Sequence, residues 1–501
     1  MNGINLIIIL AYSTCLTFLA AFALQRLLLA SSAWRARHPE STPLSEAELP
    51  PVLVQVPLYN EASVARRIIE HVARLDYPLD RLHIQILDDS TDDTVAICRD
   101  VVAGFEQDGL RIEHVRRPIR EGFKAGALAY GLDCSEAPLV AIFDADFMPE
   151  PSFLRTLVGH FQDDRVGAVQ ARWGHLNRSE SALTRGQGFL LDGHFLNEHA
   201  GRFARGCFFN FNGTAGIWRR ACIEDAGGWS GRTITEDLDL SYRAQIRGWK
   251  FVFRGDVVVD AELPADTTAF KVQQHRWAKG SIETARLMIG PIWKAAGLSM
   301  SQRLEASLHL LGNTAYPIVL ALGLLMPWVL NIRFETEPGL FHLLDTLLFF
   351  STTGVLFATY LGAASRAGLR GRELSWVPMA MSLGVGLAIN NCRAMGEALM
   401  GHRTAFVRTP KRGEQGEMPK MSAQLKATLW QSSLEVVFGL YLATGMWVAF
   451  QHGRWLALPL VSLFSGGFLI LGVGSIYTSV KVMWLARRHP VMVEPVYPER
   501  I

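Results

Sequence analysis

The sequence lacks the cysteine patterns that hold structural metals. Six cysteines occur among 501 residues, and none forms a C-x-x-C pair or another spacing typical of a metal site. We therefore expect free thiols, mostly buried, at Cys15, Cys98, Cys134, Cys207, Cys222 and Cys392.

A marked excess of charge of one sign is also lacking. The formal net charge is only +2, whereas a dedicated nucleic-acid binder carries a strongly basic field, so no nucleic-acid partner is expected. Internal repeats of fixed period and low-complexity tracts are absent from the sequence as well. Apolar residues, in contrast, are plentiful: 49% of the chain is hydrophobic, and the mean hydropathy is +0.17. These values predict a membrane protein.

Five apolar runs are long enough to cross a membrane. The first, residues 4–24, has no small-residue cleavage site, which favours a retained transmembrane helix over a signal peptide. The others, roughly 308–330, 340–364, 428–450 and 456–480, approach the ~20 residues that a spanning helix needs. The shorter stretch 376–391 is interrupted by Pro378, Asn390 and Asn391, which predicts an interfacial or re-entrant helix.

Lysine and arginine crowd the connectors on one side of these runs. They cluster after the first run, within 366–372 and 403–412, and at 487–488, whereas 331–339 and 451–455 carry one arginine each. The positive-inside rule then predicts a cytosolic middle region, with the N-terminus outside and the C-terminus inside. We expect a multi-pass protein of the bacterial inner membrane, or of the Golgi membrane if eukaryotic.

The middle region has the pattern of an α/β fold. Val52–Val56, Ile84–Leu87 and Leu139–Phe143 are short apolar runs typical of buried parallel strands, and Ala62–Leu75 has helical spacing. Acidic pairs directly follow two of these strands, so both pairs should meet at the carboxyl edge of one sheet, where such folds bind ligands. We expect a helix at 1–30, a catalytic domain at 45–300, hairpins at 305–365 and 425–485, an interfacial helix and loop at 374–420, and a tail at 486–501.

Asp144 and Asp146 form a D-x-D motif after the third predicted strand. Hard carboxylate oxygens hold Mg²⁺ or Mn²⁺, and such an ion neutralises the diphosphate of an activated sugar. A D-x-D alone is common and often lies in a solvated turn. Its position at a strand end favours the metal site.

Asp88 and Asp89 begin a polar run that ends in Asp92 and Asp93. Asp92 and Asp93 could simply cap the next helix, while for Asp88 and Asp89 we favour contacts to a nucleotide base and ribose. Lys124, flanked by small residues, is predicted to bind a donor diphosphate as a point charge.

Thr235, Glu236 and Asp237 precede a helical stretch, with Thr235 as a plausible N-cap. A carboxylate in the first helical turn is kept ionised by the helix dipole, which suits a general base. We assign the base to Asp237, with Glu236 as the second candidate. Helix capping alone would explain Glu236 about as well.

Gln273, Arg276 and Trp277 lie within little more than one helical turn. Arg276 can stabilise a departing diphosphate by bidentate contacts, and the face of Trp277 can stack on a sugar ring. His275 between them is predicted to be a packing or solvent residue.

In this order, the motifs D, D-x-D, T-E-D and Q-x-x-R-W resemble glycosyltransferase family 2, specifically its membrane-integral processive branch. That branch contains cellulose synthase, hyaluronan synthase and the cellulose synthase-like A and C proteins. Matching stretches also lie at Gln55–Glu61, Phe211–Gly216 and Phe406–Lys411. The last two look closest to the A and C group, whose members make mannan, glucomannan or xyloglucan backbones.

The resemblance implies a GT-A, Rossmann-like catalytic domain and inverting transfer from UDP-glucose or GDP-mannose to a polysaccharide acceptor, with a divalent metal. The motif match places Asp89 at the nucleotide, Asp146 at the metal, Asp237 as base and Trp277 at the acceptor. Gln273, Gly213 and Thr214 are further acceptor-binding candidates. Phe406, Thr409 and Lys411 resemble the gating loop of cellulose synthase, although Arg408 and Pro410 depart from its pattern.

Two other functions are compatible with the sequence. One is a non-processive transferase that glycosylates a membrane lipid, as ceramide glucosyltransferase does with similar motifs. The other is a transporter or binding protein with a degenerate transferase domain, against which the intact acidic motifs argue. Polar residues within the apolar runs, namely His309, Asn313, Tyr316 and Glu435, could line a path for a polymer or could hydrogen bond between helices.

Overall fold

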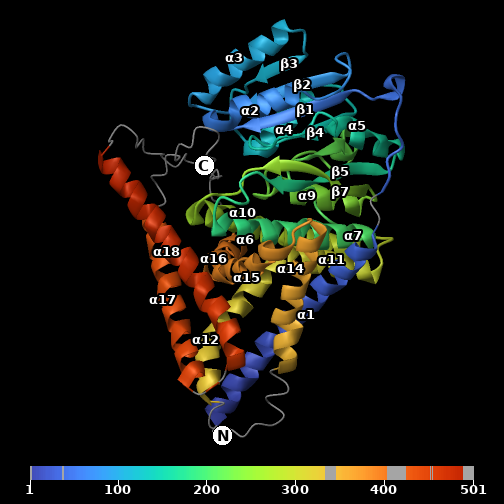
Figure 1. Ribbon diagram of the computed structural model, residues 1–501. Helices are drawn as coiled ribbons and strands as arrows, with labels where there is room; N and C mark the ends of the chain where they lie inside the picture. Colours follow the sequence, from blue (N-terminus) through green and yellow to red (C-terminus); the bar gives the residue numbers. More distant parts are fainter. Residues whose placement is uncertain are drawn as a thin grey trace.

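The computed structural model describes residues 3–36, 39–332, 346–402, 425–451, 453 and 455–488. A layered sheet-and-helix domain occupies one end of the molecule, and long helices extend from it to the other (Figure 1). The described N-terminal residues lie at the far tip of these helices. The chain therefore crosses the helical half before it enters the sheet.

A seven-stranded mixed sheet forms the centre of the domain, in the order β3-β2-β1-β4-β6-β5-β7. Strands β3, β2, β1 and β4 run parallel to one another, β6 is antiparallel to both β4 and β5, and β7 is parallel to β5. The strands are β1 Val52–Leu58, β2 Leu82–Asp88, β3 Ile112–Val115, β4 Leu139–Ile142, β5 Val166–His175, β6 Gly216–Arg219 and β7 Lys250–Ala261. The predicted α/β class is confirmed, and β1, β2 and β4 are the three strands expected from the sequence.

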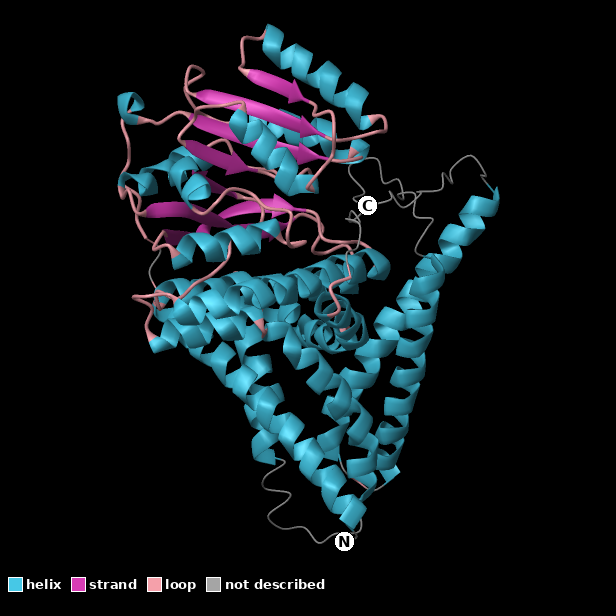
Figure 2. Cartoon of the chain, turned by 180° about the vertical axis from the view of Figure 1, so that it is seen from behind, coloured by secondary structure: helices cyan, strands magenta, loops and turns pink. Residues whose placement is uncertain are grey.

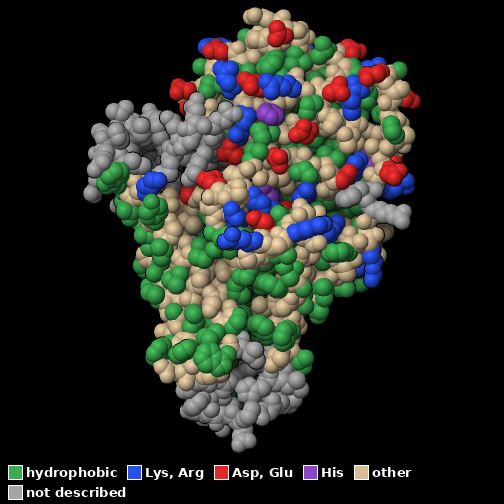
Figure 3. Space-filling model, viewed as in Figure 1, with side chains coloured by type: hydrophobic (Ala, Val, Ile, Leu, Met, Phe, Trp, Pro, Cys, Tyr) green, Lys and Arg blue, Asp and Glu red, His purple; other side chains and the backbone are tan. Residues whose placement is uncertain are grey.

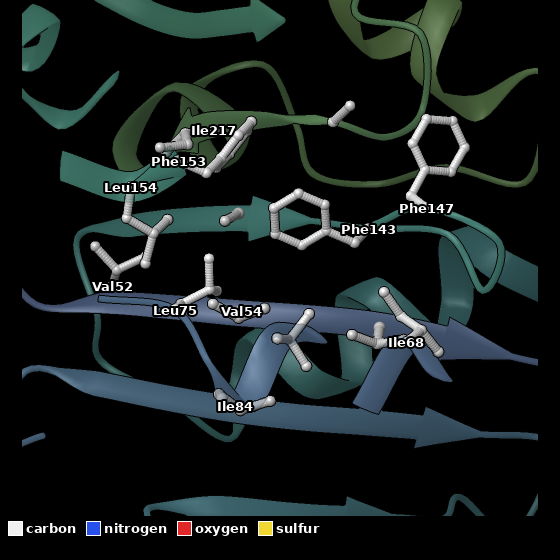
Figure 4. Close-up of a cluster of buried hydrophobic side chains, with 14 of the residues drawn as sticks. Val52, Val54, Ile68, Leu75, Ile84, Phe143, Phe147, Phe153, Leu154 and Ile217 are labelled. Atoms are coloured by element: carbon white, nitrogen blue, oxygen red, sulfur yellow. The ribbon is translucent and has the colours of Figure 1, made fainter. Parts of the chain in front are cut away.

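Helices cover both faces of the sheet, because the side chains of each buried strand alternate between two cores. Val52, Val54 and Val56 of β1 enter one core together with Ile68 of α2, while Leu53 enters the other. Figure 4 shows the first core, where side chains from the strands meet those of the covering helices. The helices of this domain are α2 Ala62–Ala73, α3 Thr94–Gln107, α4 Phe123–Asp133, α5 Phe153–Val158, α8 Arg220–Asp225 and α9 Glu236–Ile246.

Among the described residues, five helices are long and apolar enough to span a membrane, and they coincide with the five apolar runs of the sequence. They extend away from the sheet domain and approach one another toward the end of the molecule that is marked N (Figure 2). Charged side chains gather on the sheet domain and at its junction with the helices, and they are sparse over the lower helical surface in this view (Figure 3). The candidate spans are Gly3–Arg35, Gly312–Ile332, Thr346–Arg366, Thr428–Gln451 and Leu458–Trp484.

A layer of helices separates the sheet from the candidate spans (Figure 1). The long helix α10 packs against α16, and α15 packs against α6 and α18. The stretch 376–391 contributes two short helices rather than one, because a turn at Leu387 separates them. The layer and span helices are α1 Gly3–Arg35, α6 Ala182–Asp192, the π-helix η3 Gly193–His199, α7 Ala200–Ala204, α10 Thr267–Lys294, α11 Met300–Leu310, α12 Ala315–Ile332, α14 Val355–Arg366, α15 Val377–Gly386, α16 Ala388–Leu399, α17 Leu425–Gln451 and α18 Leu458–Arg488.

Candidate active site

A cavity of about 190 Å³ lies at the carboxyl ends of β1 and β4, on the side of the sheet that faces α10. Parallel strands present their carboxyl ends at one edge, and ligands of open α/β sheets bind there. Most of the residues singled out in the sequence line this cavity: Asp89, Lys124, Asp144, Asp146, Gly213, Glu236, Asp237, Gln273, Arg276 and Trp277. The chain thus brings together motifs that are up to almost two hundred residues apart.

Asp88 and Asp89 point to different places, although they are neighbours in the sequence. Asp89 lines the cavity, whereas Asp88 does not and is 2% exposed. Asp88 accepts hydrogen bonds from the backbone N–H of Ser90 at 2.8 Å and pairs with His114 at 2.9 Å. Burial alone would raise the pKa of Asp88, but these hydrogen bonds hold the pKa below its ordinary value. Asp88 therefore supports the loop, and only Asp89 faces the cavity.

An arginine that the sequence did not single out holds Asp89 in place. The guanidinium of Arg117 donates to both oxygens of Asp89, at 2.8 and 2.6 Å. Beside this pair, the guanidinium of Arg120 stacks on the ring of Tyr59, 3.3 Å from its centroid. Such a bidentate pair fixes the plane of the carboxylate. The two arginines occur three residues apart, just before the predicted phosphate-binding lysine Lys124. This spacing is the feature of the sequence that could have identified them as site residues.

Of the two predicted cap residues, only Asp92 supports the start of α3. Its carboxylate accepts a hydrogen bond from the backbone N–H of Thr94 at 3.0 Å. Asp93 occupies the cap position, but its side chain makes no capping hydrogen bond.

Lys124 lies in the first turn of α4 and is paired with the D-x-D motif. Its ammonium donates to Asp144 at 2.5 Å and to the carbonyl of Gly213 at 2.8 Å, and it lies 3.9 Å from Glu236. Burial alone would lower the pKa of Lys124, but the carboxylates of Asp144 and Glu236 raise it above its ordinary value. Lys124 is therefore a charged group at the centre of the cavity.

Thr214 supports the D-x-D motif from behind instead of lining the cavity. It is fully buried, and its hydroxyl accepts a hydrogen bond from the backbone N–H of Asp144 at 2.9 Å. The acceptor contact predicted for Thr214 would need an exposed hydroxyl. The structure gives this residue a role in orienting Asp144 instead.

Asp237 lies in the first turn of α9, as predicted, but its environment is not the one expected from the helix dipole. Burial first, and then repulsion from Glu236, raise the pKa of Asp237 to about 7, although Lys124 acts in the opposite direction. Thr235 occupies the predicted N-cap position of α9, but its hydroxyl makes no capping hydrogen bond. A carboxylate whose pKa lies near 7 suits proton transfer at neutral pH.

Gly213 leaves room between the side chains of Asp237 and Lys124. Its φ of +78° is a conformation that side chains rarely adopt, and an added Cβ would lie 3.1 Å from Asp237 and 3.3 Å from Lys124. A side chain here would strain the backbone and enter the space where a ligand must sit. Gly213 is thus required by both the turn and the cavity.

Helix α10 contributes Gln273, Arg276 and Trp277 to the cavity wall. Trp277 lies beside Trp173 of β5, with ring centroids 6.2 Å apart and planes tilted by 52°. Two apolar faces therefore meet next to the carboxylates, which suits stacking of a sugar ring. Trp173 has no distinctive neighbours in the sequence, and only the fold identifies it.

A second cavity, of about 470 Å³, begins where the first one ends. Both are lined by Asn212, Asp237, Gln273 and Trp277, and the second continues among α1, α12 and α14. His309, Asn313 and Tyr316 line this second cavity. Glu435 does not, because it is fully buried and its carboxylate pairs with Lys271 of α10 at 2.7 Å. The gating-like residues Phe406, Thr409 and Lys411 lie outside the described residues.

Residues 50–280 match the family model described as glycosyltransferase-like family 2. Probable glucomannan 4-beta-mannosyltransferase 10 of Arabidopsis thaliana is 45% identical over 261 residues, which cover 51% of this chain and 47% of that protein. Glucomannan 4-beta-mannosyltransferase 2 of the same plant is 42% identical over 301 residues, which cover 57% of this chain and 56% of that protein. The chain thus spans about half the length of the curated relatives it matches.

Among solved structures, the mannosyltransferase PcManGT from Pyrobaculum calidifontis, in complex with GDP-Man and Mn²⁺, has a similar fold. The TM-score is 0.52 at 21% identity, and the match covers 78% of this chain and 100% of that one. At this identity the likeness concerns the fold alone. It confirms the predicted GT-A architecture.

Proposed function

We propose that residues 50–280, which match the model of glycosyltransferase-like family 2, form a catalytic domain that extends a β-linked polysaccharide of the mannan or glucomannan type. The observation that carries this proposal is the meeting of two cavities at Asp237 and Trp277. The first cavity has the charges that a nucleotide sugar needs. The second continues among the candidate spans and has the mixed polar and apolar wall that an extended acceptor needs.

The donor occupies the first cavity. Asp89, fixed by Arg117, receives hydrogen bonds from the nucleoside, and Lys124 and Arg276 bind the diphosphate. Asp144 and Asp146 present hard oxygen ligands in the same cavity and fit Mg²⁺ or Mn²⁺. When bound, the ion neutralises charge that develops on the departing diphosphate.

Asp237 removes the proton from the acceptor hydroxyl. The hydroxyl oxygen attacks the anomeric carbon as the bond from that carbon to the diphosphate oxygen breaks, so the configuration inverts. The proton moves to the carboxylate of Asp237, whose pKa of about 7 matches a base that works near neutrality. Lys124 stabilises the leaving diphosphate after it exchanges Asp144 for the donor.

The acceptor lies across the junction of the two cavities. Its terminal sugar stacks on Trp277, and the preceding sugars extend into the second cavity between α1, α12 and α14. Because this cavity continues among candidate membrane spans, we propose that the growing polymer leaves through it and so crosses the membrane. The basic connectors favour a cytosolic catalytic domain.

The donor is GDP-mannose. Two relatives named glucomannan 4-beta-mannosyltransferases support mannosyl transfer, and a protein of the same fold is described in complex with GDP-Man. UDP-glucose is the alternative donor, and a membrane lipid is the alternative acceptor.

The test uses purified full-length protein in lipid nanodiscs. The protein is incubated with GDP-mannose or UDP-glucose, with and without Mn²⁺, and the product is sized and treated with an endo-β-mannanase. We expect a mannanase-sensitive polymer with GDP-mannose only. A product of one sugar on a lipid, or a polymer formed only from UDP-glucose, would refute the proposed acceptor or donor respectively.

A further inference from the structure

Helix α10 presents two different faces. Gln273, Gln274 and Trp277 line the cavities. Lys271, His275 and Lys279 recur every four residues, so they lie along one side of the helix, and each makes a polar contact with α16, α17 or the residues that follow α16. We call the side of α10 that carries Lys271, His275 and Lys279 the ion-paired face. These three ionisable side chains thus face α16 and the candidate span α17, away from the cavities.

The first contact of the ion-paired face is a buried ion pair with a candidate membrane span. The ammonium of Lys271 donates to Glu435 of α17 at 2.7 Å and to the hydroxyl of Ser432 at 3.2 Å. Gln431 donates to the other carboxylate oxygen of Glu435 at 3.0 Å. Asn390 of α16 donates to the backbone carbonyl of Lys271 at 3.0 Å. The start of α10 is therefore held by two helices at once.

The other two contacts meet at Glu397 of α16. His275 pairs with Glu397 at 2.9 Å, and the ammonium of Lys279 lies 3.7 Å from the same carboxylate oxygen. Lys279, which is 1% exposed, also donates to the backbone carbonyl of His402 at 2.6 Å. Arg393 donates to the second oxygen of Glu397 at 2.9 Å. Glu397 therefore gathers three cationic or ionisable groups.

Further along its length, α10 holds the loop that carries the general base. Glu283 of α10 accepts a hydrogen bond from the backbone N–H of Ile234 at 2.9 Å. Gly280 packs so closely on Thr235 that an added Cβ would lie 2.4 Å from that side chain. Ile234 and Thr235 directly precede Glu236 and Asp237. A shift or rotation of α10 would therefore move the base together with Trp277.

We propose that the ion-paired face of α10 is a positioning element, and that Lys271, Glu435 and Glu397 are positioning residues for transfer. The inference rests on the proposed function. Through these pairs, the membrane helices fix the rotation and height of α10, and α10 in turn fixes Trp277 on the acceptor side and Asp237 on the chemical side. None of the three residues needs to touch substrate.

Stability alone does not account for the buried pair. Replacing a buried ion pair by apolar side chains of similar size is often neutral or stabilising, because the charges no longer have to be removed from water. What an apolar pair lacks is direction, since it lets helices slide and rotate past one another. A positioning role therefore predicts that stability and turnover separate in such a variant.

The experiment compares three variants in lipid nanodiscs: Lys271→Met/Glu435→Met, the reversed pair Lys271→Glu/Glu435→Lys, and the control Arg254→Met/Asp256→Asn. The control removes an ion pair of β7, at 2.7 Å, that lines neither cavity. We expect the apolar pair to keep the parental unfolding temperature and to lose about 10- to 100-fold in kcat, as small misplacements do, with a smaller change in the donor dissociation constant because Arg276 lies on the same helix. The reversed pair should recover most of the loss, and the control should keep parental kcat.

A parental kcat in the apolar pair would overturn the proposal. If that variant fails to fold, Glu397→Gln serves instead, because the side chain of Glu397 is 13% exposed and the amide keeps its size. It should lower kcat by a larger factor than it changes the donor dissociation constant. A parental kcat for Glu397→Gln would equally refute the positioning role.

A distance measurement separates this inference from the proposed function. Spin labels are placed at Leu287 of α10 and Tyr130 of α4, which are 39% and 41% exposed. The background lacks Cys15, Cys134 and Cys392, the thiols that are not buried. The parent should give one narrow distance and the apolar pair a broader or shifted one. An unchanged distribution refutes the inference even if the parent shows no transfer, whereas absent transfer with the expected broadening refutes only the proposed function.

Discussion

The proton transfer assigned to Asp237 should give the reaction an acidic limb near neutrality. Burial and the neighbouring Glu236 raise the pKa of Asp237 to about 7. A general base works only when ionised, so activity is lost as the pH falls through that pKa. At saturating donor and metal, kcat at pH 7 should be about half of its plateau, and at pH 6 about one tenth.

The perturbation that tests this origin is Glu236→Gln. It removes the repulsion from Glu236 but leaves the burial, which is the larger cause, so the pKa of Asp237 should fall and remain above that of a free aspartate. At pH 6 the variant should then retain a larger fraction of its own plateau than the parent, which retains about a tenth. Gln keeps the size of the side chain, and this limits changes in packing.

The assay measures initial rates of polymer formation from pH 5.5 to 8.5, with donor affinity determined separately at each pH. Asp237→Asn is the companion variant, and it should lose about 10²–10⁴ in rate with donor affinity retained. If the acidic limb of the pH–rate profile stays at pH 7 in Glu236→Gln, repulsion from Glu236 does not raise the pKa of Asp237. If Glu236→Gln is inactive and Asp237→Asn is active, the base is Glu236. If both retain parental turnover, the first turn of α9 has no catalytic role.

Three further predictions concern the donor and acceptor sides of the site. Asp146→Ala should abolish transfer and remove the metal dependence of donor binding, measured calorimetrically with and without Mn²⁺; undiminished turnover of the parent in a chelator would contradict the metal site. Trp277→Ala should keep donor affinity and lose elongation, because stacking worth on the order of 1 kcal/mol acts on the acceptor; loss of donor affinity with normal elongation would place Trp277 on the donor side instead. Arg117→Ala should weaken donor binding by roughly tenfold or more, since it frees Asp89 and leaves a buried charge without its bidentate partner, whereas an unchanged nucleotide dissociation constant would exclude Asp89 from the donor site.

Local features of the sequence were sufficient to predict several helices and strands and most of the residues that line the first cavity. Three short apolar runs form β1, β2 and β4, and the five long apolar runs form the candidate spans. Acidic residues that directly follow parallel strands have little freedom in where they end up, because the strand fixes its carboxyl end at the sheet edge. For this reason the sequence pattern alone assigns Asp89, Asp144 and Asp146 to one site, and all three line the first cavity.

The features of the site that the sequence did not predict depend on contacts between distant parts of the chain. Alternation along the strand turned Asp88 away from the cavity and toward His114, and burial beside Glu236 set the pKa of Asp237 against the expectation from its helix. Glu435 was a candidate for a polymer path, but the fold places Lys271, 164 residues away in sequence, against it. Desolvation and charge pairing act through space and over a few ångströms. Hydropathy and residue order therefore specify which residues stand at the strand ends and which runs can span a membrane. Packing in three dimensions sets which charges meet, which are buried, and how α10 connects the candidate spans to the segment that carries Asp237.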